Sequence, residues 1–273
     1  MKLHIQHTTD YRYTEPLRYA LQTLWLTPLS GPSQTVDFWS LGAPEELFAQ
    51  TDAFGNSIHS YTFVGELSDN VRWSLVNAAG TVETRGIAEF NDAPGMPLPQ
   101  LYLRESPLAR PHPSLAGFGR RFMTAPGLGG KVDLQAVLAL ASGVADAVSY
   151  QKNSTNVTTT ALQAFEAGAG VCQDQAHVMV AICRSLGIPA RYVSGYFYAA
   201  NAPDLASHAW ADVCLDVAGR RWASIDVTHR CPIDERHVRL AMGTDYSACP
   251  PIKGVRHGGG EESMTVSITI EPA

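Results

Sequence analysis

Residues 168–189 read GAGVCQDQAHVMVAICRSLGIP, and this stretch decides the fold of the chain. Apolar residues recur at helical spacing after Cys172, and the run closes on Gly187 and Pro189, which stop helices. We therefore expect a buried central helix with Cys172 in its first turn. Unpaired N–H groups and the positive end of the helix dipole favour a thiolate there. Cys172 is thus a candidate nucleophile, although burial as a structural residue is the commoner role of a single cysteine.

Downstream of this helix, two predicted strands place a histidine and an aspartate on one face. Every second residue is apolar in the segments SHAWADVCL (207–215) and RWASIDV (221–227). His208 and Asp226 both fall on the other face, where they would otherwise be plain solvated side chains. If residue 214 pairs with residue 220, His208 lies opposite Asp226, with Cβ atoms roughly 4.5–5.5 Å apart. The pattern predicts an imidazole–carboxylate hydrogen bond, and Trp210 and Trp222 on the same face are expected to cover the cleft.

Upstream, the chain changes character twice. Residues 1–90 contain six segments that alternate apolar and polar residues, separated by turn sequences such as Asn77-Ala-Ala-Gly80, and they predict an antiparallel β-sandwich. Residues 91–130 are rich in proline and glycine and are expected to form a connector that lies along both domains. Residues 131–273 read as helices followed by strands, with the last strand near 264–270, so the fold class is α+β.

The sequence resembles the transglutaminase-like superfamily, which has a papain-type thiol fold. The motifs that carry the resemblance are GVCQDQAHVMVAICRSLGIPARYVSGY, SHAWADVCL and WASIDVTH. The first 85 or so residues are similar to the β-domain that precedes this core in the bacterial branch. The resemblance implies that Cys172 is the nucleophile, His208 the general base and acid, and Asp226 the residue that orients His208. It departs from the usual pattern at Val227, where proline is common, and at Thr244, where a basic residue often stands.

The triad implies acyl transfer through a thioester on Cys172. The substrate would be a peptide or another amide, including one within a protein. We favour a cysteine protease-like amidase because nothing in the sequence indicates a means of excluding water. An amine-accepting transglutaminase is the alternative, and a non-catalytic protein-binding module on the same scaffold is a second one.

The N-terminal domain carries no convincing catalytic group, because His4, His7 and His59 have no cysteine near them in the sequence. We expect this domain to pack on the core and to shape one wall of the cleft. The last prediction for the site concerns metals. Zinc could in principle use Cys172, His208, His229, Cys231 or His237, but the usual spacing of paired ligands is missing. We therefore expect neither a metal nor a cofactor.

Composition narrows the partners and the compartment. Twenty Lys and Arg against 26 Asp and Glu give a net charge of −6, which disfavours nucleic acid and anionic membranes as partners. No apolar run approaches the roughly 20 residues of a membrane span. The five cysteines all lie at or after position 172, an odd and uneven set unlike a disulfide framework. A cytoplasmic location is therefore expected.

Overall fold

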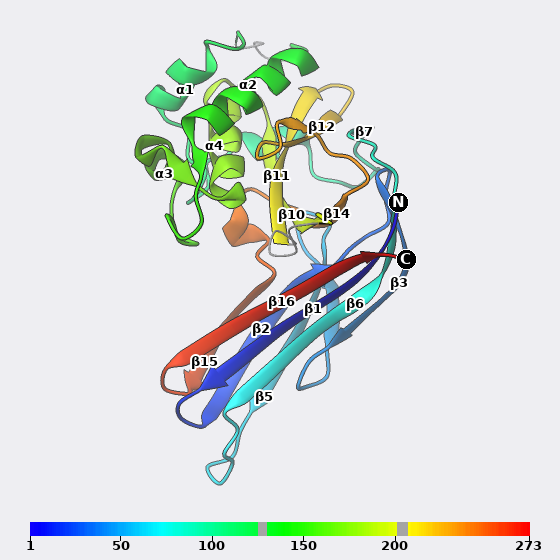
Figure 1. Ribbon diagram of the computed structural model, residues 1–273, viewed down its shortest axis with the longest axis vertical. Coiled ribbons are helices and arrows are strands. Elements are labelled where there is room, and N and C mark those ends of the chain that lie inside the picture. Colours follow the sequence, from blue (N-terminus) through cyan, green and yellow to red (C-terminus); the bar gives the residue numbers. More distant parts are fainter. Residues whose placement is uncertain (125–129, 201–206) are drawn as a thin grey trace.

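The computed structural model describes residues 1–124, 130–200 and 207–273. A β-sandwich forms one part of the molecule, and a layer of helices on a sheet forms the other (Figure 1). Within these described ranges, no helix has the length and apolar character needed to cross a membrane.

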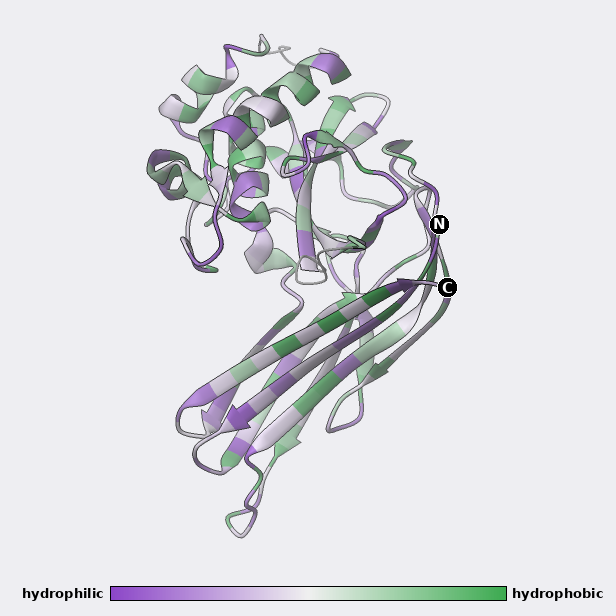
Figure 2. Cartoon of the chain, viewed as in Figure 1, coloured by the Kyte–Doolittle hydropathy of each residue, from purple (hydrophilic) through white to green (hydrophobic). Residues whose placement is uncertain are grey.

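The sandwich consists of two four-stranded antiparallel sheets with the orders β16-β1-β6-β3 and β15-β2-β5-β4. Buried and exposed residues alternate along β1, β2 and β6. Figure 2 shows hydrophobic residues in green and hydrophilic residues in purple as bands along the strands of the sandwich. The predicted N-terminal sandwich is thereby confirmed. Its strands are β1 (Lys2–Tyr13), β2 (Leu17–Thr27), β3 (Gln34–Gly42), β4 (Phe48–Thr51), β5 (Ser57–Val64), β6 (Trp73–Thr84), β15 (Ile252–Gly258) and β16 (Glu262–Pro272).

The turn expected at Asn77–Gly80 is wrong, because these residues lie in the middle of β6. Gly80 pairs with Trp39 on β3. A Cβ atom on Gly80 would lie 2.5 Å from the Trp39 side chain and 2.2 Å from the Phe38 carbonyl oxygen. The glycine therefore makes room for a neighbouring strand and does not mark a turn.

The C-terminal strand was expected to complete the catalytic core, and this is also wrong. β16 pairs with β1 over eleven residue pairs, from Leu3↔Pro272 to Tyr13↔Glu262, and β15 pairs with β2. The chain thus returns to the sandwich, and its two ends lie close together (Figure 1). Alternation predicts a strand but not its partner, because both sheets accept the same period-two pattern.

In the described ranges, the core consists of four α-helices and a sheet of the order β13-β12-β11-β10-β14, with β7 paired to β12. Helix α4 runs through the centre, and its residues 174–184 are buried, as expected for the helix that Cys172 opens. It packs on the face of the sheet that presents apolar side chains such as Val213 and Ile225. These observations confirm the α+β class. The elements are β7 (Glu89–Asn91), a 3-10 helix (Pro99–Leu103), α1 (Pro113–Gly119), α2 (Leu134–Ala147), β8 (Ser149–Tyr150), α3 (Ala161–Ala167), β9 (Ala169–Gly170), α4 (Cys172–Ser185), β10 (Ala190–Phe197), β11 (Ser207–Asp216), β12 (Arg221–Asp226), β13 (Cys231–Pro232), β14 (His237–Gly243) and a short 3-10 helix (Tyr246–Ala248).

The sandwich covers the edge of this core sheet. Strand β14 lies at the edge, and two amide side chains of the sandwich pair with its backbone as another strand would. Gln34 bonds the carbonyl and N–H of Arg239 at 2.9 and 2.8 Å. Asn56 does the same to Met242 at 2.7 and 2.9 Å. An otherwise exposed strand edge is therefore satisfied by side chains of the other domain.

The connector is anchored on the core through Asp92. This buried carboxylate accepts hydrogen bonds from Arg191 at 3.0 Å and from the Trp222 indole at 2.8 Å. Both aromatic residues expected to cover the cleft, Trp210 and Trp222, are fully buried on the sheet face away from α4, among other aromatic and charged side chains. Trp222 helps to hold the connector through its bond to Asp92, and neither tryptophan covers the cleft.

Candidate active site

Cys172 is the first residue of α4 and is partly exposed. The carboxylate of Asp174 accepts hydrogen bonds from the Val171 N–H at 2.8 Å and from the Thr155 hydroxyl at 2.6 Å. It thus ties the chain before Cys172 and the loop before α3 to the first turn of the helix. Gly170 has room for no side chain, because a Cβ there would lie 2.6 Å from that of Asp174. The position of the thiol is therefore set by local chemistry at the helix start.

His208 lies near the start of β11 and is 6% exposed. Its Nε2 is 2.8 Å from Oδ2 of Asp226, at the end of β12. The predicted pairing of residues 214 and 220 is wrong, because Cys214 pairs with Trp222. The register is shifted by two residues, and an even shift leaves each side chain on its predicted face. The histidine and the aspartate therefore meet on a diagonal instead of directly across the two strands.

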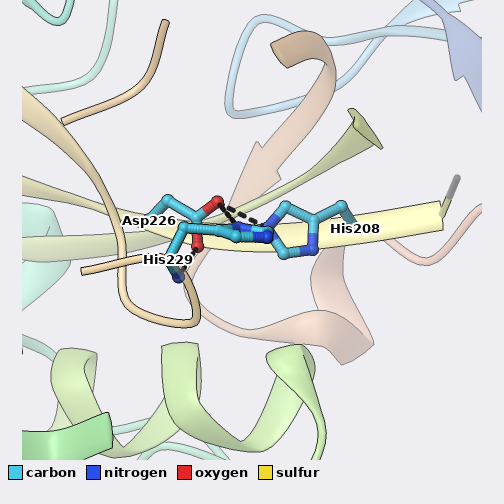
Figure 3. A group of neighbouring side chains, drawn as sticks. All are labelled: His208, Asp226 and His229. Carbon is cyan, nitrogen blue, oxygen red and sulfur yellow. Dashed lines mark hydrogen bonds and ion pairs between the residues drawn. The ribbon is translucent and has the colours of Figure 1, made fainter. Parts of the chain in front are cut away.

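Three imidazoles converge on the same carboxylate oxygen (Figure 3 shows two of them). Oδ2 of Asp226 lies 2.8 Å from His208 Nε2, 2.7 Å from His229 Nδ1 and 2.9 Å from His237 Nε2. The other oxygen, Oδ1, accepts the backbone N–H of His229 at 3.1 Å. Sequence reasoning considered His229 and His237 only as zinc ligands and missed this arrangement. The short Asp226–His229 spacing is a local signal, whereas His237 comes from the edge strand β14.

The tautomer of His237 follows from its second nitrogen. The Asp234 backbone N–H points at His237 Nδ1 at 3.1 Å, so a neutral His237 accepts there and donates from Nε2 to Asp226. Asp234 Oδ1 also lies 3.1 Å from Nδ1 and favours the doubly protonated ring. In both states His237 donates to Asp226. This buried ring therefore helps to hold the carboxylate in position for His208.

These contacts shift the charge states of the pair. Burial opposes ionisation of Asp226, but hydrogen bonds from His208, His229 and His237 hold the pKa of its carboxyl well below the usual range. Burial also opposes protonation of His208, yet hydrogen bonds with Asp226 and Cys172 raise its pKa to about 10. The structure therefore favours an imidazolium next to an ionised carboxylate, in reach of the Cys172 thiol.

The other four thiols differ from Cys172. Cys183, Cys214 and Cys249 are buried, and burial raises the pKa of Cys183 to about 12 and that of Cys214 to about 11. Cys231 is partly exposed, but burial and the nearby Asp226 raise the pKa of its thiol to about 11. Each of these thiols is therefore protonated at neutral pH.

The spacing within the histidine cluster bears on the question of a metal. His208 Nε2, Asp226 Oδ2 and His229 Nδ1 all lie within 4.8 Å of one another. However, both nitrogens lie at 2.7–2.8 Å from the oxygen, which is hydrogen-bond distance. Ligands at 2.0–2.1 Å from a tetrahedral zinc ion would be roughly 3.3 Å apart. The group is therefore interpreted as a hydrogen-bonded carboxylate.

Cys172 and His208 line one cavity of about 210 Å³. Its walls come from both parts of the molecule. The core contributes Tyr192 and Tyr196 of β10, and the sandwich contributes His7 of β1. The sequence did not predict His7 as part of the site, because no cysteine lies near it along the chain. The fold brings it to the cavity that contains Cys172.

Comparison with known proteins agrees with this architecture. Residues 123–227 match the model of the transglutaminase-like superfamily, and residues 3–83 match the bacterial transglutaminase-like N-terminal region. The chain belongs to the transglutaminase-like superfamily. Cys172, His208 and Asp226 all lie within the part that matches the superfamily model.

Several proteins are similar to this chain over most of their length. An uncharacterized protein of Mycobacterium tuberculosis is 30% identical over 98% of this transglutaminase-like chain and 92% of its own. A Mycobacterium leprae relative is 25% identical, with 98% of both chains covered. A candidate cysteine protease from Cytophaga hutchinsonii has the same fold, with a TM-score of 0.76 at 24% identity over 99% of this chain and 90% of its own.

Proposed function

We propose that this protein is a thiol-dependent acyl-transfer enzyme that acts on a peptide or another amide. The observation that carries the proposal is the shared cavity of Cys172 and His208, with Asp226 bonded to the far nitrogen of the imidazole. Because Nε2 is occupied by Asp226, Nδ1 is the nitrogen that faces the reaction. A nucleophile, a base and a residue that orients the base are the parts that thiol catalysis needs.

The reaction follows from these positions. His208 holds the Cys172 proton as an imidazolium, and the thiolate sulfur attacks the carbonyl carbon of the amide. The tetrahedral intermediate collapses as the C–N bond breaks, and the imidazolium protonates the departing amine. A thioester remains on Cys172. Water or an amine then attacks it, passes its proton to His208, and releases the acid or the new amide together with the free thiol.

We propose two groups as donors that stabilise the oxyanion. The backbone N–H of Cys172 belongs to the first turn of α4, whose N–H groups have no partner within the helix. Tyr192 lines the cavity and packs in the same cluster as Cys172. Burial raises the pKa of Tyr192 well above its usual value, so its hydroxyl remains a donor at every physiological pH.

Hydrolysis is the favoured outcome for the thioester, on the expectation drawn from the sequence that water is not excluded. Amine transfer is the alternative. The neutral cavity lined by Tyr192 and Tyr196 does not distinguish between the two acceptors. All five cysteines are free thiols, which supports the predicted reducing, cytoplasmic location.

A single experiment tests the reaction and its acceptor. The full chain and its Cys172→Ala variant would be incubated with short peptide aminomethylcoumarin amides, with and without a primary amine. We expect coumarin release and a transient acyl adduct on Cys172, both lost in the variant. The mass of the product separates hydrolysis from amine transfer. Equal release by the variant would exclude the thiol mechanism, and folded protein with no adduct would favour a binding module.

A further inference from the structure

The sandwich places a buried polar pair in the wall of the catalytic cavity. His7 of β1 and Tyr196 of β10 both line it, and they are 4% and 1% exposed. His7 Nδ1 is 2.7 Å from the Tyr196 hydroxyl, and the rings meet edge to face with centroids 5.7 Å apart. The pair joins the two parts of the molecule next to Cys172 and His208.

The pair belongs to a short chain of hydrogen bonds, and the protons in this chain can be donated in either direction. His7 Nε2 lies 3.2 Å from the Thr9 hydroxyl. Burial lowers the pKa of His7 to about 4, so the ring is neutral at pH 7 and has one donor and one acceptor. If Thr9 donates to Nε2, then Nδ1–H donates to Tyr196 and frees the phenolic proton. If Nε2–H donates to Thr9, Tyr196 donates to Nδ1 and its oxygen accepts from a ligand.

The remaining lining is neutral as well. Apart from Cys172 and His208, the described residues that line the cavity are uncharged aromatic, polar or apolar side chains. A charged group that entered would lose its hydration and find no counter-ion beyond the reacting pair. A neutral group with both a donor and an acceptor would find partners whichever way the Thr9–His7–Tyr196 chain runs.

We propose that this cavity binds one uncharged, hydrogen-bonding group of the acyl substrate, a carboxamide or a hydroxyl, and that His7 and Tyr196 determine this specificity. The inference rests on the proposed function, because it names the substrate of the same site. At about 210 Å³ the cavity is smaller than the roughly 300–1,000 Å³ of pockets for drug-sized ligands. It therefore suits one side chain next to the reacting carbonyl.

Matched electrophiles test the proposal without knowledge of the natural substrate. Five acyloxymethyl ketones that differ only in the side chain of one N-acetylated residue (Gln, Ser, Leu, Glu or Lys) would be reacted with the full chain. In each case the Cys172 sulfur bonds to the methylene carbon and the carboxylate leaves. The rate of attachment at Cys172 is read by intact mass. We expect the Gln and Ser probes to react at least tenfold faster than the Glu and Lys probes.

Variants then assign the preference to the pair. Tyr196→Phe removes only the hydroxyl, and we expect it to reduce the advantage of the Gln and Ser probes over Leu about tenfold. His7→Phe provides a second variant with a similar effect. The control is Tyr61→Phe, because Tyr61 is also 1% exposed and hydrogen-bonded, to Gln22 at 2.7 Å, but lies within the sandwich and outside the cavity. The control should keep the full preference.

The outcomes of these experiments distinguish a failure of the specificity role from a failure of the proposed function. Methyl methanethiosulfonate carries no carboxamide and no hydroxyl: the Cys172 sulfur takes its methylthio group and methanesulfinate leaves, so the rate of this labelling reports the reactivity of the thiol without selection by the pair. If this reagent labels Cys172 but the five ketones show no preference, or if Tyr196→Phe slows all five equally, the specificity role is excluded while the nucleophile stands. If neither methyl methanethiosulfonate nor any ketone modifies Cys172, the proposed function itself fails, and the specificity role with it.

Discussion

At the scale of single residues, Asp226 holds the candidate site together, because one of its oxygens meets three imidazoles. A carboxylate with this many donors cannot turn away when His208 moves. The orientation of His208 therefore depends on residues that never approach the substrate.

Replacing Asp226 by asparagine should lower the pKa of His208 from about 10 toward its ordinary value of 6.5. The reason is that a neutral amide stabilises the imidazolium less than a carboxylate does. In the natural chain this pair contributes stability that is complete below about pH 6.5 and is lost as the pH rises through about 10. NMR titration of the histidine ring protons measures the shift, and an unchanged midpoint near pH 10 would contradict it.

His237 is a positioning residue, and the contribution of its hydrogen bonds to activity can be tested separately from that of its volume. We expect His237→Phe to reduce kcat roughly 10- to 100-fold with little change in KM, because Asp226 loses a donor and His208 loses alignment. His237→Gln retains a donor and should recover most of the loss. A thermal melt of both variants controls for folding. Equal kcat values for the two variants would show that the ring only fills space.

Cys172 should be the thiol that iodoacetamide modifies first at pH 6. The other partly exposed thiol, Cys231, is held protonated by burial and by the nearby Asp226, and the remaining three are buried. Peptide mapping after short exposure measures the order. Cys231→Ala is the matched control and should leave the total rate unchanged. Uniform labelling of all five thiols in the folded chain would count against an activated Cys172.

At the scale of elements, the edge of the core sheet depends on two amide side chains. Asn56 is 4% exposed and bonds both the N–H and the carbonyl of Met242 on β14. This contact supplies what a neighbouring strand would supply, and it comes from a turn of the sandwich. Gln34 makes the same contact with Arg239, three residues before Met242 on the same strand.

Asn56→Leu keeps the size of the side chain and removes its hydrogen bonds. We expect a loss of about 2–4 kcal/mol in the free energy of unfolding, because two buried backbone groups lose their partners. Gln50→Leu is the control, since Gln50 is exposed and makes one long contact with Ser60 at 3.3 Å. Urea unfolding of both variants measures the difference. A change below about 0.5 kcal/mol for Asn56→Leu would mean that water replaces the amide.

At the scale of the whole molecule, the sandwich and the core share one packed interior. Tyr196, Val238 and Leu240 of the core are buried in the same cluster as Leu3 and Ile5 of the sandwich. The C-terminal strands add to this dependence, because β16 and β15 have β1 and β2 as their partners. The sandwich therefore serves as one wall of the cavity that contains Cys172 and His208, and as a support for both ends of the chain.

A truncated chain that begins near Lys131 should be insoluble or much less stable than the full chain. It would expose the shared cluster and leave β15 and β16 with unpaired edges, which promotes aggregation. Solubility and thermal melting measure this. A truncated chain that is a soluble monomer with full activity toward every substrate would contradict the wall role. The sandwich would then be an independent partner-binding module.

The sequence by itself determined the elements and the faces of the site. The helix that Cys172 opens, the strands that carry His208 and Asp226, and the common face of these two residues all follow from periods of 3.6 and 2. These periods are properties of neighbouring residues, so they can be read locally. Even the error of two residues in strand register left the faces unchanged, because the period of a strand is two.

Only the tertiary structure decided which distant segments meet. The return of β16 to β1, the approach of His237 to Asp226 and the entry of His7 into the cavity depend on contacts between residues far apart in the chain. His7 and Tyr196, for example, are 189 positions apart. Local alternation is the same for a strand in either domain, so it carries no information on partners. Packing of the whole chain selects them, because only one arrangement buries all the apolar faces and satisfies the edges together.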